Sequence, residues 1–184
     1  MKKLVTIISI MLLAGFLSAQ EAKVGNVNIT RTSIDSTKLK LDDFNFENLT
    51  NILGNKSFVL EANTINDKWG NQKFVNNLIN FVMVDSTLST IQVGNDFAIG
   101  ANGVGGVTVK GKISGWKIKK DEKKKSFLIS FTVSTPISLY DAFINVYGDG
   151  NASATISGMT SSKITFRGQI VSLDNSKVYV GSHL

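Results

Sequence analysis

Residues 141–173, DAFINVYGDGNASATISGMTSSKITFRGQIVSL, carry the clearest fold signal in the chain. Their pattern is that of three antiparallel strands joined by two turns. Apolar and polar residues alternate in the middle strand, which runs Ala152, Ser153, Ala154, Thr155, Ile156, Ser157. Asp149-Gly150 is typical of a two-residue hairpin turn in which both central residues have positive φ. The stretch therefore predicts an antiparallel meander with one apolar face.

The same alternation recurs before the meander. Strands are expected near residues 58–62, 78–84, 89–93, 107–118 and 127–133. The strand at 78–84 has apolar residues of both parities, so we expect both of its faces to be covered. These segments predict a mainly β fold, and we expect an antiparallel meander that closes into a lipocalin-like barrel of roughly eight strands. Closure would remove the unpaired strand edges that an open meander exposes.

One strand breaks the alternation. Val107, Val109 and Ile113 share one parity, whereas Trp116 and Ile118 have the other. A regular strand cannot direct both sets inward, because successive side chains point to opposite faces. We therefore expect a bulge or sharp bend within residues 111–115.

A single helix near the N-terminal side is expected over residues 42–53. Its apolar residues fall at three- and four-residue spacing, namely Phe46, Leu49, Ile52 and Leu53. Asp42 or Asp43 suits the N-cap, and Gly54 suits a left-handed exit. We expect this helix to pack against the sheet or to plug it.

The first 19 residues have the features of a signal peptide. Lys2 and Lys3 precede an apolar run over residues 4–16, and Ala19 offers a small residue at the cleavage position. A transmembrane anchor is the alternative, but the run is short for a bilayer span. We expect residues 20–40 to be a flexible segment and residues 41–184 to form a single β-barrel domain. The chain has no cysteine, so it is neither a lipoprotein nor disulfide-bonded, and we expect a soluble protein exported to the periplasm or beyond the cell.

The formal net charge of +6 is concentrated in one place. Residues 117–125, KIKKDEKKK, carry it together with the leader lysines. Anionic lipid headgroups or polysaccharide are one interpretation of this run, and a solvated hairpin tip that discourages edge aggregation is the other. At most we expect weak contact with an anionic surface through five of the lysines, Lys119, Lys120, Lys123, Lys124 and Lys125. No aromatic residues lie between the lysines, and we expect no nucleic-acid binding.

Few residues offer catalytic or metal-binding chemistry. His183, beside the C-terminus, is the only histidine, and there is no thiol. A serine-histidine-aspartate site and a His/Cys zinc site are therefore not expected. Carboxylate pairs drawn from Glu61, Asp67, Asp85, Asp96 and Asp141 would be the remaining enzymatic route. We expect a non-enzymatic protein with no metal site and no cofactor.

Four residues are candidates for a ligand site inside the barrel: Trp69, Trp116, Ala152 and Ala154. The tryptophans could line a pocket, and the small inward residues, with Gly168, would leave room for a small apolar or amphipathic ligand. Core packing is the alternative. The functional hypotheses are accordingly a barrel that binds such a ligand or an envelope partner, or a structural or protein-interaction module of the cell envelope whose core is filled.

Several short motifs occur in a recognisable order. They are FVLEA at 58–62, GGVTV at 105–109, the lysine-rich hairpin, VYGDG at 146–150 and SKITFRG at 162–168. In this order the chain resembles the Bacteroidetes family known as domain of unknown function 4251. The resemblance implies an exported, mostly β protein similar to lipocalin-topology barrels, with no activity or catalytic residues to carry over. Family members often have Leu-Pro-Tyr-Phe-Gly where this chain has Ile91-Gln92-Val93-Gly94-Asn95.

Overall fold

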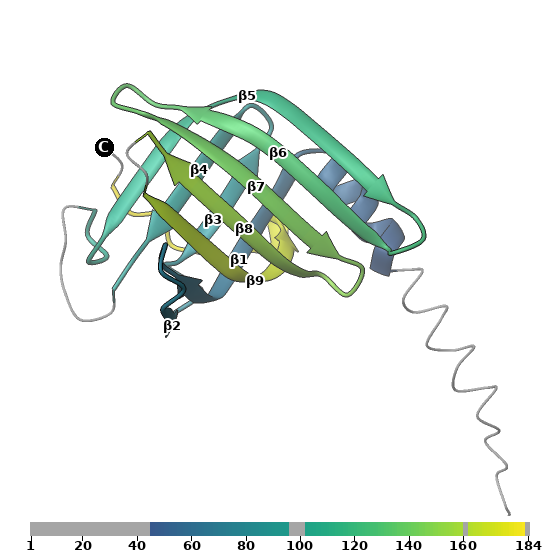
Figure 1. Ribbon diagram of the computed structural model, residues 1–184, viewed down its shortest axis with the longest axis horizontal. Coiled ribbons are helices and arrows are strands. Elements are labelled where there is room, and N and C mark those ends of the chain that lie inside the picture. The colour runs from purple at the N-terminus through teal and green to yellow at the C-terminus, as the bar shows by residue number, and fades with distance from the viewer. Residues whose placement is uncertain (1–44, 96–101, 160–161, 183–184) are drawn as a thin grey trace, which may run out of the picture.

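The structure is a computed structural model that describes residues 45–95, 102–159 and 162–182 (Figure 1). The expected signal peptide (1–19), the flexible segment (20–40), the helix caps at Asp42 and Asp43, Asp96 and His183 all lie outside these ranges. Within the described ranges, no helix combines the length and the apolar character that crossing a membrane requires.

The described strands form one antiparallel sheet that closes on itself. Its strands are β1 (Ser57–Asn66), β2 (Gln72–Phe74), β3 (Phe81–Asp85), β4 (Leu88–Val93), β5 (Val107–Asp121), β6 (Ser126–Ser134), β7 (Leu139–Tyr147), β8 (Asn151–Gly158) and β9 (Lys163–Ser172). Neighbouring strands follow the order β2-β1-β3-β4-β5-β6-β7-β8-β9, and β1 also pairs with β9. The short β2 pairs only with the last three residues of β1, so the closed barrel has eight strands, as predicted.

The predicted irregularity is present in β5. Ser114 pairs with Thr132 and Lys117 with Ser130, so Gly115 and Trp116 together lie opposite Phe131. Gly115 has φ +62, a left-handed conformation that favours glycine. The extra residue reverses the parity of the strand, and it thereby directs both Ile113 and Trp116 towards the core.

The barrel interior is filled with side chains. The largest of those that are fully buried include Phe58, Leu60, Ile129, Ile144 and Phe166. They belong to one core cluster to which the barrel strands β1, β3, β4 and β6–β9 contribute. Close packing of this kind gives the barrel a hydrophobic core in place of the disulfides that the chain lacks.

Helix α1, residues 45–54, joins the core at the end of the barrel where β1 begins. Phe46, Leu49 and Leu53 are buried, and the rings of Phe46 and Phe127 lie 4.9 Å apart. The expected left-handed exit at Gly54 is wrong, because the residue with positive φ is Lys56, at +50. The left-handed residue thus comes two positions after Gly54 and directly before β1.

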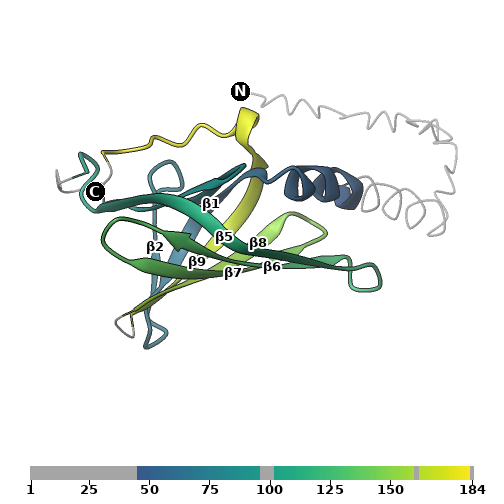
Figure 2. The ribbon, with the colours of Figure 1, turned by 90° about the horizontal axis from the view of Figure 1, so that it is seen from above.

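The C-terminal segment covers the outside of one half of the barrel. The 3-10 helix η1 (Leu173–Asn175) lies against β1 and β3, and Figure 2 shows the yellow segment on the side opposite β6, β7 and β8. Val59, Phe81 and Gln92 have the outward parity, yet each is fully buried. The expectation that the strand predicted at residues 78–84 is covered on both faces is therefore confirmed, although the observed strand, β3, begins at Phe81.

The turn between β7 and β8 differs from the predicted two-residue type. Gly150 has φ +85, whereas Asp149 does not have positive φ. The amide of Gly150 donates to the carbonyl of Tyr147 at 2.9 Å, and the Asp149 carboxylate accepts from the Asn151 amide at 2.9 Å. An aspartate side chain that accepts an amide two residues later stabilises the turn without the second left-handed residue.

Candidate functional site

The two tryptophans lie in different environments. Trp69 is 76% exposed in the turn between β1 and β2, and the Lys68 ammonium lies 4.5 Å from the centre of its ring. Trp116 stacks on Phe131 with ring centres 5.3 Å apart and packs against the core. The structure therefore does not bring Trp69 and Trp116 into one pocket.

The small residues of β8 and β9 are packed in the barrel wall, and two of them, Ala152 and Gly168, also line an open hollow in that wall. Ala152 and Ala154 are buried in the core cluster. A Cβ at Gly168 would collide with the backbone of Glu61 and Ala62 on β1. The absent side chain allows β1 and β9 to approach closely beside the register shift between Ala62 and Thr64. The ligand-binding role of Trp69, Trp116, Ala152 and Ala154 stays a prediction. All of these except Trp69 are packed in or against the core.

Three of the candidate carboxylates, Glu61, Asp67 and Asp141, make separate structural contacts. Glu61 accepts hydrogen bonds from Ser176 at 2.7 Å and from Asn77 at 3.2 Å. Asp141 accepts from the Thr132 hydroxyl at 2.7 Å. Among residues 45–95, 102–159 and 162–182, no group of three or more His, Cys, Asp or Glu side chains could hold a metal ion.

Asp67 organises the exposed turn that carries Trp69. The Asn71 side chain, at 2.8 Å, and the backbone amides of Asn71 and Trp69, both at 2.9 Å, donate to its carboxylate. These donors hold the pKa of Asp67 below its ordinary value, and the Asn71 side chain contributes most. This carboxylate is a turn-forming group.

The lysine-rich hairpin joins β5 and β6. The Asp121 carboxylate accepts from the amides of Lys123 and Lys124 at 3.1 and 3.0 Å. Lys120 forms an ion pair with Glu122 at 2.8 Å, and its ammonium lies 4.7 Å from the centre of the Phe46 ring. The hairpin has the form that the solvated-tip interpretation predicts, and contact with an anionic surface stays a prediction.

The outer side of β5–β9 is exposed, in contrast to the half of the barrel that the C-terminal segment covers. Three large apolar residues point outward from β6 and β7, with Tyr147 at the end of β7: Leu128, Phe143 and Tyr147, which are 46%, 51% and 55% exposed. Leu128 lies opposite Asn145, so Phe143 and Tyr147 are its two diagonal neighbours on β7. We call this uncovered side of β5–β9 the outer face. Its apolar ridge is a feature that binding surfaces commonly have.

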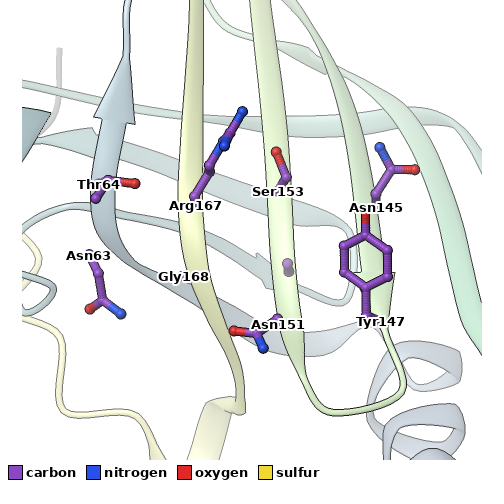
Figure 3. A pocket seen from close by; sticks show the side chains of 9 residues that line it. Asn63, Thr64, Asn145, Tyr147, Asn151, Ser153, Arg167 and Gly168 are labelled. Atoms are coloured by element: carbon purple, nitrogen blue, oxygen red, sulfur yellow. The ribbon is translucent and has the colours of Figure 1, made fainter. Parts of the chain in front are cut away.

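An open hollow of about 500 Å³ lies beside this ridge (Figure 3). Its polar lining comes from β1, β7, β8 and β9: Asn63, Thr64, Asn145, Tyr147, Asn151, Ser153 and Arg167. Within the described part of the chain, the side chains of Asn145, Ser153 and Arg167 make no hydrogen bond or ion pair. These groups are available to a ligand outside the barrel.

A second open hollow, of about 180 Å³, shares Asn145 and Tyr147 with the first. It adds Lys119, Asp121, Lys124 and Leu128 to the lining. Tyr147 thus separates a hollow containing an arginine from one containing lysines. Sequence patterning shows only that Arg167 points away from the core, and it does not show that residues from four strands surround one hollow.

These features define a class of protein: a closed antiparallel barrel with a filled interior and an uncovered, hollowed outer face. The family described as Domain of unknown function (DUF4251) matches residues 40–170, and the chain belongs to this family. A crystal structure of a DUF4251 family protein from Bacteroides eggerthii is similar, at 32% sequence identity and a TM-score of 0.61. The similarity covers 72% of this chain and 91% of that chain. A comparison with curated proteins found no match.

Proposed function

We propose that this protein is a non-enzymatic interaction module of the cell envelope that acts through its outer face. The filled interior is the observation that carries the proposal. Phe58, Ile144 and Phe166 occupy the space that an internal apolar ligand would need. The predicted alternative of a module with a filled core therefore fits the packing better than a carrier of small apolar molecules.

The asymmetry of the barrel surface supports the same choice. On one side the C-terminal segment covers the barrel, and Val59 and Phe81 are fully buried there. On the other side Phe143 and Tyr147 stay about half exposed next to polar hollows. A partner bound there would bury apolar area and would pair polar groups that have no partner among the described residues.

The leader supports a location beyond the inner membrane. Lys2 and Lys3 before an apolar run, with Ala19 at the cleavage position, are the elements of an export signal. A folded core that needs no cysteine suits an oxidising compartment as well as a reducing one.

Native mass spectrometry of protein purified from its own envelope fraction tests this proposal. We expect the protein in that fraction, without its first 19 residues, and with the mass of the bare chain after gentle removal of surface partners. Retention of a lipid-sized molecule that survives washing, and that only unfolding releases, would show that the barrel is a carrier. Recovery of the protein from the cytoplasm with its leader intact would refute export.

A further inference from the structure

We infer that the outer face binds an acidic oligosaccharide or polysaccharide, and that Arg167 and Tyr147 are its main contacts. This inference rests on the proposed function, because it names the occupant of the same face. It concerns the hollow between β1, β7, β8 and β9 and its continuation towards Lys119 and Lys124.

Arg167 supplies the preference for negative charge. It points outward from β9, it is exposed, and it has no carboxylate partner among the described residues. A guanidinium presents paired donors in a plane, which matches the two oxygens of a carboxylate. On the other side of Tyr147, Lys119 and Lys124 line the second hollow together with one carboxylate, Asp121, so two positive charges there stand against one negative charge. A ligand that carries acidic groups at intervals would meet a cation on each side of the ring.

The amides and hydroxyls supply the preference for sugar hydroxyl groups. Asn145 and Ser153 lie opposite each other on β7 and β8, and Asn63 and Thr64 complete the far wall. An asparagine amide both donates and accepts, as a sugar hydroxyl does. Asn151 is held by Asp149 at 2.6 Å and by Gln169 at 2.7 Å, so its side chain is fixed in the wall.

Tyr147 and the shape of the hollow favour a chain of sugars over a compact ligand. The tyrosine is 55% exposed between the two hollows, where its ring can pack on the apolar face of a sugar while its hydroxyl stays in water. A hollow of about 500 Å³ has room for a small oligosaccharide. Both hollows are open, so a longer chain can pass from one to the other.

Calorimetric titration of the mature protein with oligogalacturonic acid, and with maltohexaose as the neutral control, tests the inference. We expect binding of the acidic sugar, at least about tenfold weaker binding of the neutral one, and weakening by salt. Arg167→Gln should reduce the affinity about tenfold or more, which is the effect of losing one charge-assisted hydrogen bond. Tyr147→Ser should also weaken binding. Lys163→Gln, which removes a cation from the same strand outside the hollow, should leave the affinity within about twofold.

Three results would overturn the inference. One is equal affinity of wild type and Arg167→Gln, with folding of the variant confirmed by circular dichroism. Another is no binding of either sugar, which would refute the sugar as the occupant and would leave the proposed function, with a protein as partner, intact. The third is binding to phosphatidylglycerol vesicles, but not to oligogalacturonate, that depends on Lys119 and Lys124. A cargo retained inside the barrel is a separate result, since it refutes the proposed function and is detected by mass and not by titration.

Discussion

The side-chain amide of Gln92 donates to the carbonyl of Tyr179 at 2.8 Å, across 87 residues of sequence. The same nitrogen donates to Ile79, and the side-chain oxygen accepts from Thr108 and from the amide of Gly181. Gln92 is fully buried, and its donors and acceptors all have partners. This residue attaches the C-terminal segment to the barrel and so determines which half of the outside stays uncovered.

Replacing Gln92 should loosen that attachment. In Gln92→Leu the amide of Gly181 and the carbonyl of Tyr179 lose their partners, so we expect a loss of about 3 kcal/mol in the free energy of unfolding. Chemical denaturation measures this change, and proteolysis should cut the C-terminal segment sooner. Gln72→Leu, on the exposed strand β2, is the matched control and should have little effect. Equal stability of the two variants would contradict the anchoring role.

The close approach of β9 to β1 depends on Gly168. A methyl group there would collide with backbone atoms that the barrel closure holds in place. We expect Gly168→Ala to destabilise the protein by about 2 kcal/mol. Gly54→Ala is the control, because that glycine ends α1 with open space around it and should be neutral or slightly stabilising. Thermal unfolding compares the two, and a tolerated Gly168→Ala would mean that the closure is looser than described.

The left-handed residue of the β5 bulge should be sensitive to any side chain. Gly115→Val places a β-branched residue at φ +62, at a cost of about 1–2 kcal/mol. Because the bulge directs Trp116 onto Phe131, we also expect a red shift in tryptophan emission as the ring becomes wetter. Trp69 contributes a constant exposed signal. Unchanged emission and stability would show that the bulge is not required for the position of Trp116.

The Asp67 turn should respond to acid. The pKa of Asp67 is lower in the folded protein than in the unfolded chain, so its contribution is fully present above the unfolded pKa. That contribution is lost as the pH falls through the folded pKa. We expect a carboxyl titration by NMR with its midpoint below the ordinary aspartate value of about 3.9, and a midpoint closer to that value in Asn71→Ala. A midpoint that Asn71→Ala leaves unchanged would refute the assigned cause.

The strands and the closure of the barrel could be predicted because they follow from alternation along the chain. The parity conflict between Ile113 and Trp116 even located the bulge. Local turn geometry was harder to predict from the sequence. After α1 the residue with positive φ is Lys56 and not Gly54, and Asp149 does not have positive φ. At the β7–β8 turn the local hydrogen bond from the Asn151 amide to the Asp149 carboxylate takes the place of the second left-handed residue, and at Lys56 the carbonyl accepts from the amide of Ser86.

The covering segment and the outer hollow could not be predicted in the same way. The apolar residues of both parities at 78–84 indicated a covered outer side, but the pattern did not show that the C-terminal segment, held by Gln92, is what covers it. The hollow depends on how Asn63, Asn145, Ser153 and Arg167 are aligned across four strands. Such alignment depends on the register between strands, which alternation within one strand does not determine.

Methyl NMR of the mature protein during titration with oligogalacturonate tests the central claim most directly, because neighbouring residues point to opposite sides of the barrel wall. Leu128 is on the outer face, whereas Ile129, Ile144 and Ala154 are in the core. We predict that the Leu128 methyl signals shift with added sugar and that the core methyl signals do not. Shifts of Ile129, Ile144 and Ala154 with Leu128 unchanged would place the ligand inside the barrel and would contradict the account.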